Sequence, residues 1–225
     1  MKIYAHRGFS HRYPEATREA YEGAVKAGTD GFECDVRLSK EKVLVCCHDR
    51  TTKRIAGVRK VVSRTTAEEL KSIAKVITFE ELLDLAIMEK KDILVETKHP
   101  VIQGAQVEKT LLDLLRRRAH EISGSGIQIT VISFSYLAIR RLKKNYPDVA
   151  KVIKYSFAAL CNKSKKVAVN IEILRKHPGL LRRMKAETIY TWTVNSREDL
   201  HWVKSRKIDG VITDRVARAK KVLAS

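Results

Sequence analysis

The sequence contains few cysteines and no long apolar run, and each shortage excludes a class of protein. The four cysteines lack the C-x-x-C spacing of a zinc site, and we expect them to be reduced, buried or half-buried thiols. No stretch approaches the roughly 20 apolar residues of a membrane-spanning helix. The N-terminus also lacks the basic region and apolar segment of a signal peptide. These absences predict a cytoplasmic protein.

Acidic side chains are scarce relative to basic ones, since 45 Lys and Arg against 26 Asp and Glu give a net charge of +19. Such a charge attracts anionic partners: nucleic acid, anionic lipid surfaces or phosphorylated small molecules. The basic residues are spread over many expected helices, and no aromatic residues interleave with them as a nucleic-acid stacking platform would require. We therefore expect a basic exterior without a nucleic-acid groove. Weak contact with an anionic membrane and the oligomeric state stay open.

Short apolar runs alternate with helical stretches along the whole chain. Hydrophobic residues make up 44% and charged residues 32%, which is typical of a soluble globular protein. A chain of 225 residues suits one α/β barrel, so we expect a single domain over residues 1–225. The expected strands are residues 2–5, 30–36, 43–47, 92–97, 127–132, 151–155, 166–170, 188–193 and 209–213. The expected helices are residues 15–27, 66–74, 79–90, 104–121, 135–145, 178–185, 196–206 and a last one from about 215.

About eight strand–helix units predict a (β/α)8 barrel, the TIM-barrel fold of the α/β class, because a doubly wound sheet usually has fewer strands. The strand at 43–47 is surplus. Only six residues, 37–42, separate it from strand 30–36, too few for a crossover helix, so we expect an antiparallel hairpin after the second strand. If its turn centres near Lys40 and Glu41, His48 lies opposite Glu33. Beyond this hairpin we expect only a short insertion.

Three carboxylates lie near the expected ends of two strands, where the active sites of barrels are found. Glu33 and Asp35 share one face of strand 30–36, and Glu96 lies at the end of strand 92–97. Their mutual repulsion is costly unless a cation lies between them. Oxygen ligands of this kind suit one divalent metal ion, Mg²⁺ or Ca²⁺. A Glu-x-Asp pair alone is more often a solvated edge or an ion pair, so the prediction depends on the neighbouring residues.

Imidazole and basic side chains are expected around these carboxylates. His6 and Arg7 follow the first strand, and His48 follows the hairpin. Imidazoles can give and take protons near neutral pH, while Arg7 can hold a phosphate through two hydrogen bonds and Lys98 supplies a point charge. With a divalent ion, these groups are what cleavage of a phosphodiester requires. As alternatives, each histidine could be a satisfied polar residue, and Glu96 and Lys98 could neutralise each other.

Five motifs, taken in order, cover nearly the whole chain from residue 2 to about residue 216. They are HRG…PEAT…A at 6–20, GFECDVRLSKEKVLVCCHD at 31–49, ILVETK at 93–98, ISFS at 132–135 and YTWTVNSREDL…IDGVITD at 190–214. Each motif alone is weak, but the ordered set resembles the glycerophosphodiester phosphodiesterase family. The resemblance implies a (β/α)8 barrel and metal-dependent hydrolysis of a small-molecule glycerophosphodiester to sn-glycerol 3-phosphate and an alcohol.

Carried over by position, the resemblance also implies a role for each candidate residue. The implied roles are general acid and base for His6 and His48, ligation of one divalent metal ion for Glu33, Asp35 and Glu96, phosphate contact for Arg7 and Lys98, and contact with the glycerol or alcohol moiety for Trp192. The resemblance thus accounts for the polar residues that the strand ends had already singled out.

Two features depart from the family pattern. The family usually has Asn after the Glu of its Pro-Glu motif, and here Ala16 stands in that position and cannot supply amide hydrogen bonds. Residues 50–74 also form a shorter and more basic segment than usual, in a region that often helps to define the substrate pocket. Two alternatives therefore stay open: a lysophospholipid-type diester hydrolase acting in the phospholipase D sense, and a non-catalytic basic barrel that binds nucleic acid or membrane.

Overall fold

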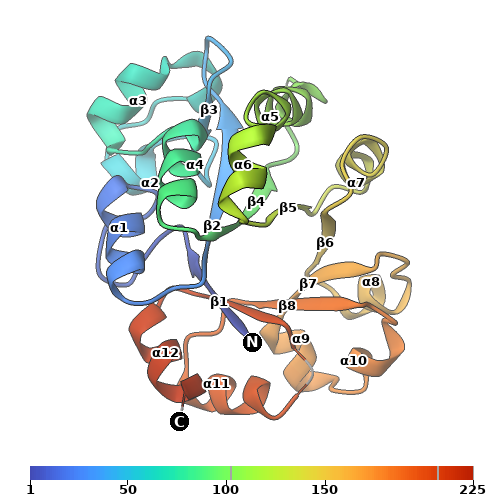
Figure 1. The fold of residues 1–225 in the computed structure, drawn as a ribbon. Helices are drawn as coiled ribbons and strands as arrows, with labels where there is room; N and C mark the ends of the chain where they lie inside the picture. Colours follow the sequence, from blue (N-terminus) through green and yellow to red (C-terminus); the bar gives the residue numbers. More distant parts are fainter. Residues whose placement is uncertain (102, 207, 225) are drawn as a thin grey trace.

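Eight parallel strands close into a barrel in the computed structural model of the chain, which describes residues 1–101, 103–206 and 208–224 (Figure 1). The strands of the chain are β1 (Lys2–His6), β2 (Gly31–Leu38), β3 (Leu44–Cys46), β4 (Asp92–Thr97), β5 (Ile129–Ser133), β6 (Val149–Ile153), β7 (Lys166–Asn170), β8 (Thr188–Trp192) and β9 (Gly210–Thr213). β1 pairs in parallel with both β2 and β9, which closes the ring. β3 lies outside the ring, antiparallel to β2. The predicted (β/α)8 barrel with a hairpin after its second strand is confirmed.

Helices connect the strands and cover the outside of the ring (Figure 1). They are α1 (Arg18–Lys26), α2 (Lys53–Ala56), the 3-10 helix η1 (Val62–Arg64), α3 (Ala67–Ala74), α4 (Phe79–Met88), α5 (Gln106–Arg117), α6 (Ala119–Ser125), α7 (Tyr136–Leu142), α8 (Ser156–Leu160), α9 (Ile171–Lys176), α10 (Leu180–Arg183), α11 (Arg197–Lys204) and α12 (Val216–Ala224). Every expected strand is present with ends shifted by at most two residues. The helix expected over 104–121 is two helices, α5 and α6, and the short helices α2, α8 and α9 were not expected.

Two tyrosines fill the barrel interior near the amino ends of the neighbouring strands. Tyr4 on β1 and Tyr190 on β8 meet edge to face, with ring centroids 5.6 Å apart. Gly31 and Gly210 leave room for these rings, because a Cβ on Gly31 would lie 2.6 Å from the Tyr4 ring and one on Gly210 would lie 2.9 Å from Tyr190. The interior is therefore packed below the carboxyl ends of the strands, and the polar residues lie above that packed layer.

Helix α1 begins three residues later than the sequence predicted. Thr17 is its N-cap, and its hydroxyl accepts a hydrogen bond of 3.2 Å from the Ala20 N–H. The residue before the cap, Ala16, has a φ of 60°, which a right-handed helix cannot contain. The expectation of a helix from Glu15 was therefore wrong, and Glu15 belongs to the loop between β1 and α1.

Ala16, which replaces the Asn of the family pattern, is held by its backbone. Its N–H donates to the Arg7 carbonyl at 2.9 Å, and its carbonyl accepts from the Ile77 N–H at 3.1 Å. Its side chain is buried at 4% exposure in a left-handed conformation, the region in which Asn and Gly are favoured over other residues. The loop thus keeps its shape through two main-chain hydrogen bonds and needs no side-chain amide.

The hairpin between β2 and β3 has a register one residue away from the predicted one. Val36 pairs with Cys46 and Leu38 pairs with Leu44, so continuation of the ladder brings position 48 opposite position 34. The cause is the turn, which the Ser39 N–H closes by donating to the Val43 carbonyl, so that it centres on position 41 alone. The pairing of His48 with Glu33 was therefore wrong, and β3 ends at Cys46, before His48.

The cysteines are free thiols, as expected, but they differ in exposure. Cys34, Cys46 and Cys47 are buried, whereas Cys161 is exposed, so the expectation of a buried or half-buried thiol was wrong for Cys161. It lies just after α8, in a short loop that leads into β7.

None of the helices in the described ranges combines the length and the apolar composition needed to cross a membrane.

Candidate active site

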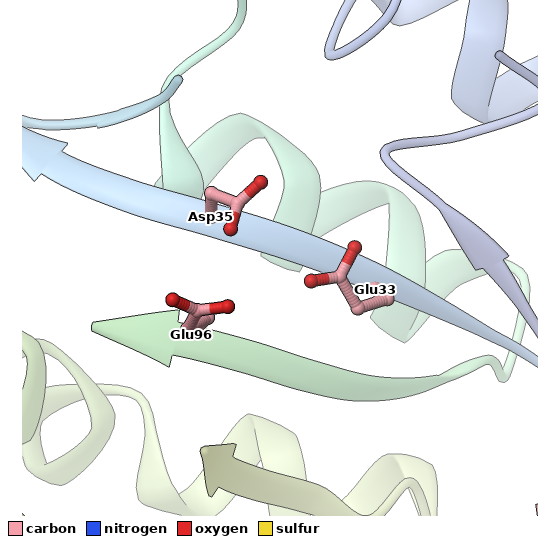
Figure 2. Close-up of side chains that lie close together, drawn as sticks. All are labelled: Glu33, Asp35 and Glu96. Carbon is pink, nitrogen blue, oxygen red and sulfur yellow. The ribbon is translucent and has the colours of Figure 1, made fainter. Parts of the chain in front are cut away.

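Three buried carboxylates meet at the carboxyl ends of β2 and β4. Asp35 and Glu96 are register partners on the two strands, and Glu33 lies two residues before Asp35 on the same face. One oxygen from each carboxylate lies within 4.8 Å of the other two. Figure 2 shows the three carboxyl groups gathered between the two strands. The strand register, which depends on the parallel pairing of the barrel, therefore brings together residues far apart in the sequence.

Burial and mutual repulsion shift the pKa values of these carboxyl groups apart. Burial first, and then the charge of Asp35, raise the pKa of Glu33 to about 7 and that of Glu96 to about 8. Burial acts the same way on Asp35, but Lys98 and Arg7 outweigh it and lower the pKa of Asp35 to about 2. Without a further cation, the site holds one firmly ionised carboxylate and two whose ionisation is disfavoured near neutral pH.

The two predicted phosphate contacts lie against this carboxylate cluster. Arg7 Nε is 2.8 Å from Asp35 Oδ2, and Lys98 Nζ is 2.7 Å from Glu96 and 3.2 Å from Asp35. The ion pair between Glu96 and Lys98 that the sequence allowed is therefore present. Both cations also line the cavity described below, where an anion could be bound.

His6 ends β1 and is held by Asp214, the residue that follows β9. Its Nδ1 lies 2.6 Å from Asp214 Oδ1, an oxygen that also accepts a hydrogen bond from the Ser10 hydroxyl. Since a carboxylate only accepts, Nδ1 carries the proton, and Nε2 is left 3.9 Å from Glu33. Burial lowers the pKa of His6, but the charges of Glu33 and Asp214 outweigh burial, and the pKa is raised overall.

His48 lies just beyond β3 and has a similar arrangement. Its Nδ1 is 2.6 Å from the carboxylate of Asp49, and its side chain is 35% exposed. Burial, together with the charges of Arg7 and Lys98, lowers the pKa of His48 against the opposing effects of Asp35 and Asp49. The two histidines thus differ in charge preference: His6 favours the imidazolium and His48 the neutral ring.

An ion-pair network that the sequence did not suggest connects the β1–α1 loop with the segment 50–74. Arg54 on α2 donates to both oxygens of Glu15, at 2.7 and 2.8 Å, and to Asp49 at 2.6 Å. Glu15 also lies 3.3 Å from Arg7. Arg54 therefore helps to position groups next to both Arg7 and His48. The basic composition of residues 50–74 was its only sign in the sequence.

A cavity of about 120 Å³ opens among these residues. Seven of the eight candidate residues line it, and the eighth, Asp35, is buried beside it between Arg7 and Lys98. Its opposite wall is apolar: Trp192 donates its Nε1–H to the Ala168 carbonyl at 3.1 Å and meets the ring of Phe134 edge to face, with centroids 5.6 Å apart. The sequence predicted Trp192 but missed Phe134, which directly follows β5.

The donor set fits a hard divalent cation. The ligand atoms are all carboxylate oxygens, the type that Mg²⁺ and Ca²⁺ prefer. In the described part of the chain, Asp35 Oδ2 is buried and faces Arg7 Nε at 2.8 Å, but the two atoms lack the geometry of a hydrogen bond. A buried oxygen of this kind and two carboxyl groups with raised pKa values are what a site built around positive charge presents.

Comparisons with known proteins find relatives over nearly the whole chain. Residues 6–218 match the profile of the Glycerophosphoryl diester phosphodiesterase family. A relative from Mycobacterium tuberculosis, named "Probable glycerophosphodiester phosphodiesterase 1", is 32% identical, and the match covers 97% of this chain and 90% of the relative. A "Glycerophosphodiester phosphodiesterase" from Caldanaerobacter subterraneus is 27% identical, over 94% of this chain and 93% of its own.

Solved structures share the barrel. The crystal structure of glycerophosphodiester phosphodiesterase from Thermotoga maritima has a TM-score of 0.80 at 26% identity and covers 99% of this chain and 98% of that chain. An Oleispira antarctica phosphodiesterase, solved in complex with the product sn-glycerol-3-phosphate, shares the fold with a TM-score of 0.76 at 17% identity, covering 100% of this chain and 97% of that one. From the profile match over residues 6–218 and the 32% identity to the relative from Mycobacterium tuberculosis, this chain belongs to the glycerophosphoryl diester phosphodiesterase family.

Proposed function

We propose that this chain hydrolyses glycerophosphodiesters to sn-glycerol 3-phosphate and an alcohol, with one divalent metal ion as cofactor. The observation that carries the proposal is a single cavity in which a cluster of buried carboxylates meets two cations and two carboxylate-oriented histidines. Family membership, and the product bound in the Oleispira antarctica structure, support this substrate class. A complete set of acidic, basic and imidazole groups favours catalysis over a purely binding role.

Glu33, Asp35 and Glu96 are the residues that would hold the ion. Their oxygens converge from two neighbouring strands, and burial raises the pKa values of Glu33 and Glu96. When bound, a Mg²⁺ or Ca²⁺ ion supplies a Lewis acid that polarises a phosphoryl oxygen. Burial, and then the charge of Asp35, disfavours ionisation of Glu33 and Glu96, so these two carboxyl groups would gain most from a bound cation.

Arg7 and Lys98 are the groups that would bind the remaining phosphoryl oxygens. Both line the cavity and are anchored by Asp35, so they present fixed charges that need little reorganisation when an anion binds. Trp192 and Phe134 form the facing apolar wall and would hold the glycerol or alcohol moiety. This arrangement orients the diester with its phosphate toward β1 and β4 and its carbon skeleton toward β5 and β8.

His6 and His48 are the proposed general acid/base pair. In each ring a carboxylate fixes the protonated Nδ1, Asp214 for His6 and Asp49 for His48, which leaves Nε2 available for proton transfer. The opposite directions of their pKa shifts favour His6 as the acid that protonates the leaving alkoxide and His48 as the base that activates the attacking hydroxyl. Over the whole reaction one P–O bond breaks, one forms, and the elements of water are added to the diester.

The direct test is turnover of a panel of diesters by the purified protein, with and without EDTA. We expect release of glycerol 3-phosphate from glycerophosphocholine and related short diesters, loss of activity with EDTA, and recovery when Mg²⁺ or Ca²⁺ is returned in excess. Lysophosphatidylcholine in the same panel separates the lysophospholipid alternative. Turnover that EDTA leaves unchanged would overturn the metal dependence, and no turnover of any diester would overturn the proposed activity.

A further inference from the structure

Large apolar side chains are exposed on the segments that follow β5 and β6. Phe157 is 75% exposed and Tyr155 is 68% exposed, and further exposed apolar residues lie beside them in the chain. The whole set is Phe134, Tyr136, Leu137, Tyr155, Phe157 and Leu160, which we call the β5–β6 rim. Exposed apolar residues are ordinary when scattered, but a group of this size at one end of a barrel marks an interaction site.

The rim belongs to one continuous part of the surface. Helices α7 and α8 both contact β6, and α8 contacts α10; Figure 1 shows α7, α8 and α10 along one side of the barrel. Between α8 and α10 lies a hollow of about 570 Å³, lined by Leu160 and Leu180 together with Arg182 and Arg183. The surface therefore combines apolar side chains with guanidinium groups in one hollow.

The part of the chain that contains the β5–β6 rim carries mainly positive charge. Residues 134–186 contain 14 Lys and Arg against two acidic residues, Asp148 and Glu172, and so hold +12 of the net +19 in under a quarter of the chain. Asp148 is itself paired with Lys166 at 2.8 Å. Within the described ranges, no carboxylate lies within ion-pair distance of Lys154 or Lys163, which flank α8. This positive charge is free to attract an external anion.

The rim is continuous with the catalytic cavity. Phe134, 41% exposed, also lines that cavity and contacts the ring of Trp192. The side chains of the rim follow the carboxyl ends of β5 and β6, which is the end of the barrel at which the carboxylate cluster lies. Any surface that covers the rim therefore faces the mouth of the active site.

We infer that residues 134–186 dock the enzyme on an anionic lipid bilayer. Aromatic and aliphatic side chains at a rim suit the interfacial region of a bilayer, and lysines and arginines around them suit its anionic headgroups. A second copy of the chain fits poorly, because two such basic surfaces repel each other. Single-stranded nucleic acid would use the aromatic and basic residues but not the exposed aliphatic Leu137 and Leu160. The docking surface is independent of the proposed reaction and would hold the active-site mouth toward the membrane.

Vesicle co-sedimentation tests the apolar part of the surface. We expect the full chain to bind phosphatidylcholine vesicles that contain phosphatidylglycerol and not vesicles of phosphatidylcholine alone. Phe157→Ser should raise the lipid concentration for half-maximal binding about tenfold. Met88→Ser is the matched control, because Met88 is 67% exposed but ends α4, before β4 and so at the opposite end of the barrel. It should bind as the wild type does.

Charge reversal tests the basic part. Lys154→Glu/Lys163→Glu should weaken binding to the same anionic vesicles at least tenfold, whereas Lys204→Glu/Lys221→Glu, on α11 and α12, should weaken it far less. All these side chains are exposed and lie outside the catalytic cavity, so turnover of soluble glycerophosphocholine should be unchanged. Turnover of the soluble substrate therefore separates a failure of membrane docking from a failure of the proposed reaction.

Three results would overturn the inference. The first is no binding to anionic vesicles. The second is binding that Phe157→Ser leaves unchanged, or that the control variants weaken as much as the rim variants do. The third is binding to single-stranded poly(U) that is tighter than binding to vesicles and that loses affinity in the same variants, which would assign the surface to nucleic acid.

Discussion

His6 and His48 are the residues on which proton transfer depends in the proposed reaction. We expect His6→Ala and His48→Ala each to lower kcat at least 100-fold, in the range typical of losing a general acid or base. His11→Ala is the matched control, because His11 lies in the loop after β1 but is exposed and outside the cavity. Steady-state kinetics with glycerophosphocholine check the prediction. Near-normal kcat in either variant would remove that histidine from the mechanism.

Asp214 should act through His6 without touching the substrate. Its oxygens bind His6 Nδ1 at 2.6 Å and the Asn195 amide at 2.6 Å. Asp214→Asn removes the negative charge that helps to raise the pKa of His6, so the limb of the pH–rate profile that reports the acid should move to lower pH, with kcat reduced about tenfold or more. A pH–rate profile measured from pH 5 to pH 9 checks this. An unshifted limb would limit Asp214 to a structural role.

The residues that the sequence revealed and those that it missed differ in how they are held. Glu33 and Glu96 lie on strands whose alternation fixes their faces, so their convergence followed from the strand pattern. Asp214 directly follows a strand and could be noticed as polar, but its partner His6 is 208 positions away in the chain, and only closure of the ring brings them together. Arg54 lies on a four-residue helix inside an irregular segment, where no periodic pattern exists to place it.

At the scale of elements, the loop between β1 and α1 depends on Gly8. Gly8 has a φ of 84°, and a Cβ there would lie 2.6 Å from the Cβ of Ala20 and 2.7 Å from its carbonyl carbon. An alanine at position 8 would be strained in this left-handed conformation and would also be packed too closely against the backbone of α1. Together these effects should lower the free energy of unfolding of Gly8→Ala by about 3 kcal/mol. Urea denaturation followed by circular dichroism measures this change.

Gly124→Ala is the control for that substitution. Gly124 lies within α6 and a Cβ there would meet no atom within 4 Å, so alanine should raise the free energy of unfolding by about 0.5 kcal/mol through its higher helix propensity. If the two variants were equally stable, the close approach of Gly8 to α1 would not be what holds the loop in place.

The elements that could be predicted are those with periodic sequences. All nine strands followed from apolar runs, whereas the start of α1 did not, because Ala16 adopts a left-handed conformation that nothing in its side chain signals. The register of the hairpin was missed for a related reason. Lys42 has a φ of 71°, and this backbone choice sets the centre of the turn. The conformation of Ala16 is fixed by hydrogen bonds to Arg7 and Ile77, which the local sequence does not reveal.

At the scale of the whole molecule, the barrel places negative charge inside and positive charge outside. The carboxylates of Glu33, Asp35 and Glu96 are buried at the strand ends, while most of the basic residues lie on the helices and connecting loops that surround the ring. Closing the ring therefore has an electrostatic cost at the carboxyl ends of the strands. Arg7 and Lys98 offset this cost only in part, because the pKa values of Glu33 and Glu96 remain raised. The stability of the metal-free protein should consequently depend on pH and on divalent ions.

The sign of that dependence follows from the raised pKa values. A carboxyl group whose pKa is higher in the folded chain binds its proton more tightly there, so its contribution to stability is complete at low pH and is lost as pH rises through the folded value. For Glu33 and Glu96 these values are about 7 and about 8, so the metal-free protein should lose at least about 2 kcal/mol of unfolding free energy between pH 6.5 and pH 9. His6, whose pKa is also raised, changes stability in the same direction.

A divalent ion should reverse this loss, because it binds the ionised carboxylates and replaces their protons. We expect 10 mM Mg²⁺ or Ca²⁺ to raise Tm by several degrees at pH 8.5 and by much less at pH 6.5, measured by differential scanning calorimetry. The variant Glu33→Gln/Glu96→Gln keeps the shape of the site but removes these two carboxyl groups, so its metal-free stability should fall much less over the same range, with His6 still contributing to the remaining slope. A pH slope in this variant as steep as that of the wild type would show that Glu33 and Glu96 do not cause the slope, and a metal effect of equal size at both pH values would show that the ion does not bind at these carboxylates.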